Sequence, residues 1–159
     1  MMSENRNERI WIYLSDVEFT TEIERHISQD TEAFVKDWKA HERPLSASFK
    51  ILHKRFILIS VDELEYTASG CSIDKQVRFI KDTEKKYNIH LLNRLLVAYL
   101  VGEKVEVIPA SKIPELLASG KINGEILVLN TAISTTKEFQ ESWQQPLKQS
   151  WLSKYLLKV

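Results

Sequence analysis

The chain has 159 residues, with 22 basic and 22 acidic side chains, so its formal net charge is zero. This length fits one domain over residues 1–159, and we expect a core of about 10–108 followed by an extension of about 109–159. The balanced charge argues against nucleic-acid binding through phosphate neutralisation. No apolar stretch has the length of a membrane span, so we expect no membrane insertion.

Cysteine usage points to a reducing compartment. Cys71 is the only cysteine, which rules out an intramolecular disulfide. No cluster of cysteine and histidine has the spacing of a zinc site. Residues 1–9 are polar and lack the apolar run of a secretory signal. We therefore expect a cytoplasmic protein with no metal and no cofactor.

The first half of the chain predicts a strand, a helix and a hairpin. Residues 10–14 are aromatic and β-branched, which favours a strand. Thr21 and Glu24 form a capping-box pattern, after which apolar residues recur at helical spacing. Residues 47–51 and 56–61 have the pattern of two hairpin arms. The second arm is apolar on both faces, so we expect it at the centre of its sheet.

A second helix and a second hairpin follow. Residues 73–87 carry an apolar stripe at helical spacing, and Asn88 suits the left-handed position that ends a helix. Residues 95–101 and 105–108 predict two strands, with Gly102 in the turn between them. Up to residue 101 the order is therefore strand, helix, strand, strand, helix, strand.

This order is the βαββαβ pattern of ferredoxin-like domains. We expect an α+β fold in which a mixed or antiparallel ferredoxin-like sheet with helices is extended at the C-terminus. The extension contains a short helix over residues 112–118 with Ser111 as N-cap, and a strand over residues 125–130. Thr135 and Glu138 then form a capping-box pattern at the start of a helical tail.

Large aromatic residues give this tail an apolar face. Trp143, Trp151 and Tyr155 recur there at helical spacing. Such residues normally pack into a core. The alternative is that they contact a protein partner or a second copy of the chain, forming a homo-oligomer.

Small, donor-rich residues gather over 69–75, between the first hairpin and the second helix. The residues that favour an anion here are Ser69, Gly70, Ser72 and Lys75. Unpaired N–H groups and the positive end of a helix dipole attract a phosphate or carboxylate. The simpler interpretation is an ordinary helix start with Ser72 as N-cap.

The same stretch holds the candidate catalytic residues, Cys71 and Asp74. A helix N-terminus favours a thiolate nucleophile, and Asp74 or Asp62 would accept a proton. The four histidines are all distant in sequence, so no local motif supplies a base. A free cysteine is also commonly a small buried side chain, and both interpretations of Cys71 stay open.

Motifs for nucleotide and metal chemistry are missing. None of the four glycines begins a GxxxxGK[ST] loop, which cradles phosphates with backbone amides and places a hydroxyl on magnesium. GxGxxG, HExxH, GxSxG and EF-hand patterns are absent as well.

The segments that carry a resemblance are residues 68–75 (ASGCSIDK), Trp11-Ile12-Tyr13, and 134–137 (STTK) and Ser150-Trp151 in the tail. Through them the chain resembles an uncharacterised family of small bacterial proteins. Members are often labelled "ABC transporter ATPase". The resemblance spans nearly the whole chain and implies no known site residues. It implies at most an association with a transporter or membrane complex.

The sequence therefore supports two hypotheses of different class. The first is a non-enzymatic binding or interaction module, because no catalytic set has a recognisable spacing. The second is a small enzyme or ligand-binding protein with its pocket at residues 69–75 and Cys71 as nucleophile.

Overall fold

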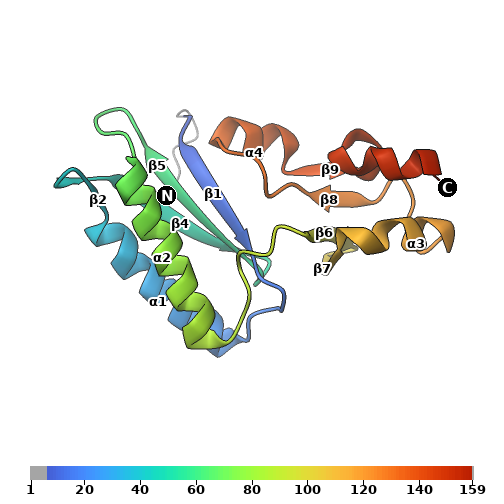
Figure 1. Cartoon of the computed structure of the whole chain (residues 1–159), viewed down its shortest axis with the longest axis horizontal. Helices are drawn as coiled ribbons and strands as arrows, with labels where there is room; N and C mark the ends of the chain where they lie inside the picture. The colour runs from blue at the N-terminus through green and yellow to red at the C-terminus, as the bar shows by residue number, and fades with distance from the viewer. Residues whose placement is uncertain (1–6, 159) are drawn as a thin grey trace.

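The computed structural model describes residues 7–158. Its first sheet, sheet A, has three antiparallel strands in the order β1-β5-β4 (Figure 1). β1 (Arg9–Leu14) and β4 (Ser46–Leu52) both pair with β5 (Phe56–Asp62). The predicted hairpin and the central place of its second arm are therefore confirmed. The φ angles of His53 and Lys54 in the β4–β5 turn are 51° and 54°, the left-handed backbone that tight hairpin turns adopt.

Two long helices cover one face of sheet A. α1 (Thr21–Asp37) has its N-cap at Thr20, one residue before the predicted Thr21, because the Thr20 side chain accepts from the Ile23 N–H. α2 (Gly70–Tyr87) ends at Asn88, whose φ of 52° confirms the predicted left-handed end. In the described chain, no helix has both the length and the apolar character to cross a membrane.

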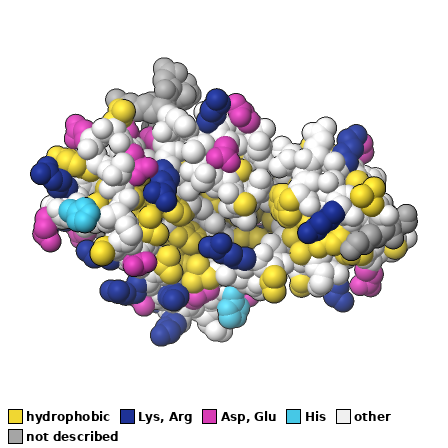
Figure 2. Space-filling view, turned by 45° about the horizontal axis from the view of Figure 1, so that its top comes forward, with side chains coloured by type: hydrophobic (Ala, Val, Ile, Leu, Met, Phe, Trp, Pro, Cys, Tyr) yellow, Lys and Arg dark blue, Asp and Glu magenta, His cyan; other side chains and the backbone are white. Residues whose placement is uncertain are grey.

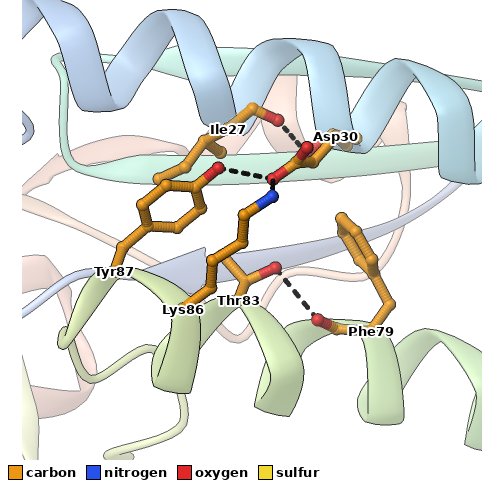
Figure 3. A network of polar contacts seen from close by, with 7 residues as sticks. Ile27, Asp30, Phe79, Thr83, Lys86 and Tyr87 are labelled. Carbon is orange, nitrogen blue, oxygen red and sulfur yellow. Dashed lines mark hydrogen bonds and ion pairs between the residues drawn. The ribbon is translucent and has the colours of Figure 1, made fainter.

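Polar contacts, drawn in Figure 3, and an aromatic contact join α1 to α2. The Asp30 carboxylate of α1 accepts from the Lys86 ammonium at 2.9 Å and from the Tyr87 hydroxyl at 2.5 Å. Phe34 and Phe79 stack with their ring centroids 4.5 Å apart. The two helices are thus tied together at several points along their lengths.

Sheet C contains four antiparallel strands in the order β7-β6-β8-β9. These strands are β6 (Leu96–Val101), β7 (Lys104–Pro109), β8 (Leu127–Leu129) and β9 (Gln144–Pro146). The β6–β7 turn contains Gly102 with a φ of 64°, so the predicted second hairpin is confirmed. A separate small pair, β2 (Lys39–Ala40) and β3 (Arg43–Pro44), lies between α1 and β4 in the chain.

Short helices accompany sheet C. They are η1 (Ala110–Lys112), α3 (Ile113–Ala118), α4 (Thr136–Ser142), η2 (Leu147–Gln149) and η3 (Trp151–Lys158), in which η marks a 3₁₀ helix. Ser111 lies inside η1 and makes no side-chain cap, so the predicted N-cap is wrong. Thr135 caps α4 as predicted, because its hydroxyl accepts from the Glu138 N–H at 3.1 Å.

The α+β class is confirmed, but the four-stranded ferredoxin-like sheet is not. Sheet A contains only the three strands β1, β5 and β4, whereas the predicted fourth strand, β6, pairs with β7 and β8 in the other sheet. A single bridge between Arg9 and Thr135 lies on the outer side of β1 instead. β6 does not join sheet A, because its backbone groups form hydrogen bonds with its hairpin partner β7 and with β8.

The elements stack as helices, sheet A, sheet C and helices, with apolar side chains between successive layers. Alternate residues of β5 divide between two of these cores: Ile57 and Ile59 face α1 and α2, and Phe56 and Leu58 face sheet C. Trp143 joins Phe56 in the middle core, and its ring lies 5.1 Å from that of Phe56. The third core lies between sheet C, α3 and η3.

Candidate functional site

The start of α2 is a closed cap built from two serines. Ser69 is the N-cap, and its hydroxyl accepts from the Ser72 N–H at 3.1 Å. The Ser72 hydroxyl accepts in turn from the Ser69 N–H at 2.7 Å. The predicted cap at Ser72 is therefore three residues too late. Ser72 is buried, so its hydroxyl serves the helix end and does not face solvent.

Neighbouring elements hold this helix start in place. The Trp38 indole N–H donates to the Ser72 carbonyl at 2.8 Å. The Glu63 carboxylate accepts from the Ala68 N–H at 2.7 Å. Deeper in α2, the Tyr13 hydroxyl donates to the Gln76 side-chain oxygen. These partners come from β1, the end of α1 and the β5–α2 loop, and the sequence has no local signal for them.

The remaining predicted site residues point outward. Gly70, Cys71, Asp74 and Lys75 are all exposed on the first two turns of α2. Gly70 is the first helical residue and does not have a positive φ, so the turn does not require glycine. Among the described residues, Cys71 makes no hydrogen bond to a histidine or carboxylate, and no group of three His, Cys, Asp or Glu could hold a metal ion.

A shallow depression of about 250 Å³ borders this segment on its N-terminal side. Its lining residues are Pro44, Ser46, Asp62, Leu64, Glu65 and Tyr66. The Arg43 guanidinium lies 5.2 Å from the centre of the Tyr66 ring on the same side. None of residues 69–75 lines this depression, and its volume is below the roughly 300–1,000 Å³ of ordinary ligand pockets.

Tyr13 is the ionisable group most strongly changed by its surroundings. Burial raises the pKa of Tyr13 to about 12, although the positive charge of Arg94 acts in the opposite direction. The hydroxyl therefore stays protonated and donates to Gln76 throughout the neutral range. This buried bond ties β1 to α2, which is a positioning role.

The tail residues proposed to meet a partner differ in accessibility. Trp143 is buried in the middle core between Phe56 and Phe139, so it packs inside the fold. Trp151 is 45% exposed on η3. Tyr155 packs partly against the third core, with the Lys154 ammonium 5.3 Å from its ring centre.

Comparison with known protein families, with curated proteins and with solved structures finds no match. The site is therefore described by its geometry alone. The start of α2 has the construction of a capped helix that displays one thiol, and the outer face of η3 displays apolar side chains.

Proposed function

We propose that this chain is a non-enzymatic interaction module that contacts a protein partner or a second copy of itself through the outer face of η3. The observation that carries the proposal is the exposure of Trp151 at 45% and Leu157 at 90%. Residues three apart in a 3₁₀ helix share one side, so Trp151, Lys154 and Leu157 form one face. Large exposed apolar side chains that gather in this way are typical of contact surfaces.

The cost of exposing this face supports the proposal. A tryptophan buries on the order of 150–250 Å² when covered, and each Å² contributes about 25 cal/mol. Lys154 lies between Trp151 and Leu157, and its charge keeps this face hydrated in the free chain. A partner that covers the face gains the apolar burial while the lysine remains at the rim.

Sedimentation at a series of protein concentrations tests the second-copy form of the proposal. We expect self-association that is lost when Trp151→Glu and Leu157→Glu are combined. Leu95→Glu is the matched control, because Leu95 is another exposed apolar residue, at 72%, that lies before β6 and outside η3. A photoreactive residue at position 151 tests the partner form. If the wild-type chain stays monomeric and position 151 forms no more adducts than position 95, the proposal is wrong.

A small enzyme with Cys71 as nucleophile is the second candidate. The observation that favours it is an exposed thiol at the second residue of α2, beside the N-terminus of a long helix. Of the anion candidates, the exposed Gly70 and Lys75 belong to the same proposal, whereas Ser69 and Ser72 already bond to each other in the helix cap. Alkylation with iodoacetamide at neutral pH tests it: a rate no faster than that of free cysteine removes the nucleophile role.

The sequence and the strand order also support a fold type, a family and a cellular location for this chain. Sheet A is interpreted as a ferredoxin-like sheet without its fourth strand, because the β1-β5-β4 order and the placement of α1 and α2 agree with that fold. The motif at residues 68–75 supports membership of the small bacterial family. The single cysteine supports a cytoplasmic location.

A further inference from the structure

The outer edge of β1 is paired at both ends and open between them. At one end the Ile10 N–H donates to the Ser134 carbonyl at 2.9 Å. At the other end the Asp16 N–H donates to the His90 carbonyl at 3.0 Å. Backbone groups of a strand alternate in direction, so the N–H groups of Ile12 and Leu14 also point to this edge.

These two N–H groups have no hydrogen-bond partner within residues 7–158. The ladder to β5 uses the odd-numbered residues of β1, as shown by the Ser15 N–H donating to the Arg55 carbonyl at 2.7 Å. Leu14 is buried and Ile12 is half-buried, so this edge is less accessible to water than a fully exposed strand. An added strand would satisfy the unpaired groups.

The surroundings of the open edge are apolar. Ile10, Ile12 and Leu14 belong to the middle core, and Trp11 and Tyr13 on the opposite face contact the core under α1 and α2. In Figure 2 hydrophobic side chains gather across the middle of the face shown, between the end that holds α1 and α2 and the end that holds sheet C. The other edge of sheet A differs, because β4 has an exposed lysine, Lys50, at its centre.

Two arginines lie near the two ends of β1. The Arg9 guanidinium lies 4.8 Å from the centre of the Trp11 ring at the start of β1. Arg94 follows the segment that brackets the other end, and its charge acts on Tyr13. Neither arginine forms an ion pair within the described part of the chain. A ligand that carries carboxylates at its two ends is complementary to this arrangement.

We propose that the outer edge of β1, between Ile10 and Asp16, binds a short extended peptide segment of a partner protein, with apolar residues flanked by acidic ones. The segment adds as a strand and accepts from the Ile12 and Leu14 N–H groups. At about 3.3 Å per residue, the open edge accommodates about four residues. This site is distinct from the outer face of η3 and goes beyond the proposed function.

A single extended segment fits better than a second copy of the chain. The segments around Ser134 and His90 bond to the outer side of β1 at both ends, so only the short stretch between them is open to another strand. The β1 strand of a second copy would carry the same two obstructions. A short isolated strand has no such flanking segments of its own, so it fits the open stretch better.

Fluorescence anisotropy with a labelled hexapeptide tests the proposal on the whole chain. The peptide is blocked at both termini, has glutamate at each end and alternates valine with threonine between them. We expect saturable binding. Methylating the peptide at the inward-facing amides should abolish it, because the methyl groups keep the peptide away from the Ile12 and Leu14 N–H groups and remove the donors that an added strand needs. Equal binding of the methylated peptide, or no binding of either peptide, would overturn the proposal.

Charge reversal provides the matched control. Arg9→Glu and Arg94→Glu should each weaken binding of the acidic peptide by up to about five-fold, as expected for loss of one exposed ion pair. They should strengthen binding of the same peptide with lysine ends. Arg25→Glu on the exposed side of α1 should change neither affinity. If all three variants respond alike, binding is non-specific and the proposal falls.

A backbone variant tests the strand contact independently. Ile12→Pro removes an N–H that the β1–β5 ladder does not use, so the fold should persist, with some loss of stability from the half-buried Ile12 side chain, while peptide binding is lost. Trp151→Glu should leave peptide binding unchanged, which separates this proposal from the one on η3. Binding that survives Ile12→Pro but disappears with Trp151→Glu would place the peptide on η3 and overturn the assignment to β1.

Discussion

The two halves of the molecule are built from elements of different length. Sheet A has strands of six or seven residues and two helices of 17 and 18 residues. Sheet C includes two strands of three residues each and is covered by short α and 3₁₀ segments. Short elements gain little from local hydrogen bonding. The C-terminal half therefore depends more on tertiary contacts, and above all on the core that it shares with sheet A.

Phe56→Ala should have the largest effect on stability, because Phe56 packs in the core that joins the two halves. The side chain is fully buried and its ring meets that of Trp143. Its truncation should reduce the free energy of unfolding by about 3–5 kcal/mol. Urea unfolding followed by circular dichroism measures the loss.

Hydrogen exchange then shows whether the halves open together. Both sheets should lose protection in Phe56→Ala, since one core stabilises them both. Leu95→Ala is the control and should change the unfolding free energy by less than about 0.5 kcal/mol, because Leu95 is exposed. Loss of protection confined to sheet C would contradict a shared cooperative unit.

Removing equivalent helix caps compares the halves directly. Ser69→Ala and Thr135→Ala each delete a side-chain oxygen that accepts from a backbone N–H three residues later. Each should cost about 1 kcal/mol of unfolding free energy, within the usual range of about 0.5–2 kcal/mol. Chemical denaturation of the two variants measures this cost. Ser69→Thr should retain most of the stability, and an equal loss in that variant would show that the cap bond is not the cause.

Local signals explain why some of these ends were predictable. Asn88 and Thr135 act within a few residues of their own helix, so residue type and spacing identified both. At the start of α2, two serines three residues apart cap each other, and the sequence pattern alone did not show which one was outermost. The site residues on α2 were correctly placed in one segment, but their exposure depends on the register of the helix.

Long-range pairing explains what could not be predicted. The apolar pattern of residues 95–101 identifies β6 as a strand but says nothing of which strand lies beside it. The bond from Trp38 to Ser72 joins residues 34 apart, and that from Tyr13 to Gln76 joins residues 63 apart. Neither has a local signature. The open edge of β1 could not be predicted for the same reason. A ferredoxin-like sheet would place β6 beside β1, but β6 pairs in sheet C instead.

Gly70→Ala should stabilise the fold, in contrast to the variants described above. Gly70 occupies the first turn of α2, and an added methyl group would meet no atom within 4 Å. Alanine has fewer conformations in the unfolded chain, so the substitution should stabilise the fold by about 0.4–1 kcal/mol. Thermal unfolding measures the gain. Gly102→Ala in the turn of sheet C is the contrasting variant and should destabilise, because its φ is 64°. A loss of stability in Gly70→Ala would show that the segment has a role that requires glycine.

The smallest expected effect concerns the contact between α1 and α2, and it depends on pH. Burial alone would raise the pKa of Asp30, but hydrogen bonds from Tyr87 and Lys86 lower it below its ordinary value of 3.8. A carboxylate with a lowered folded-state pKa stabilises the fold above its unfolded-state pKa, and this contribution is lost as the pH falls through the folded-state value.

Asp30→Asn should therefore be less stable than the wild type at neutral pH, and the difference should shrink below about pH 4. Chemical denaturation of both proteins across pH 3–7 measures this convergence. Glu32→Gln is the control on the same helix, because Glu32 forms an ion pair with the exposed Lys36 at 3.6 Å and should contribute almost nothing at any pH. A difference that stays constant into acid would mean that the α1–α2 contact depends on packing, such as the stacking of Phe34 on Phe79, and not on the charge of Asp30.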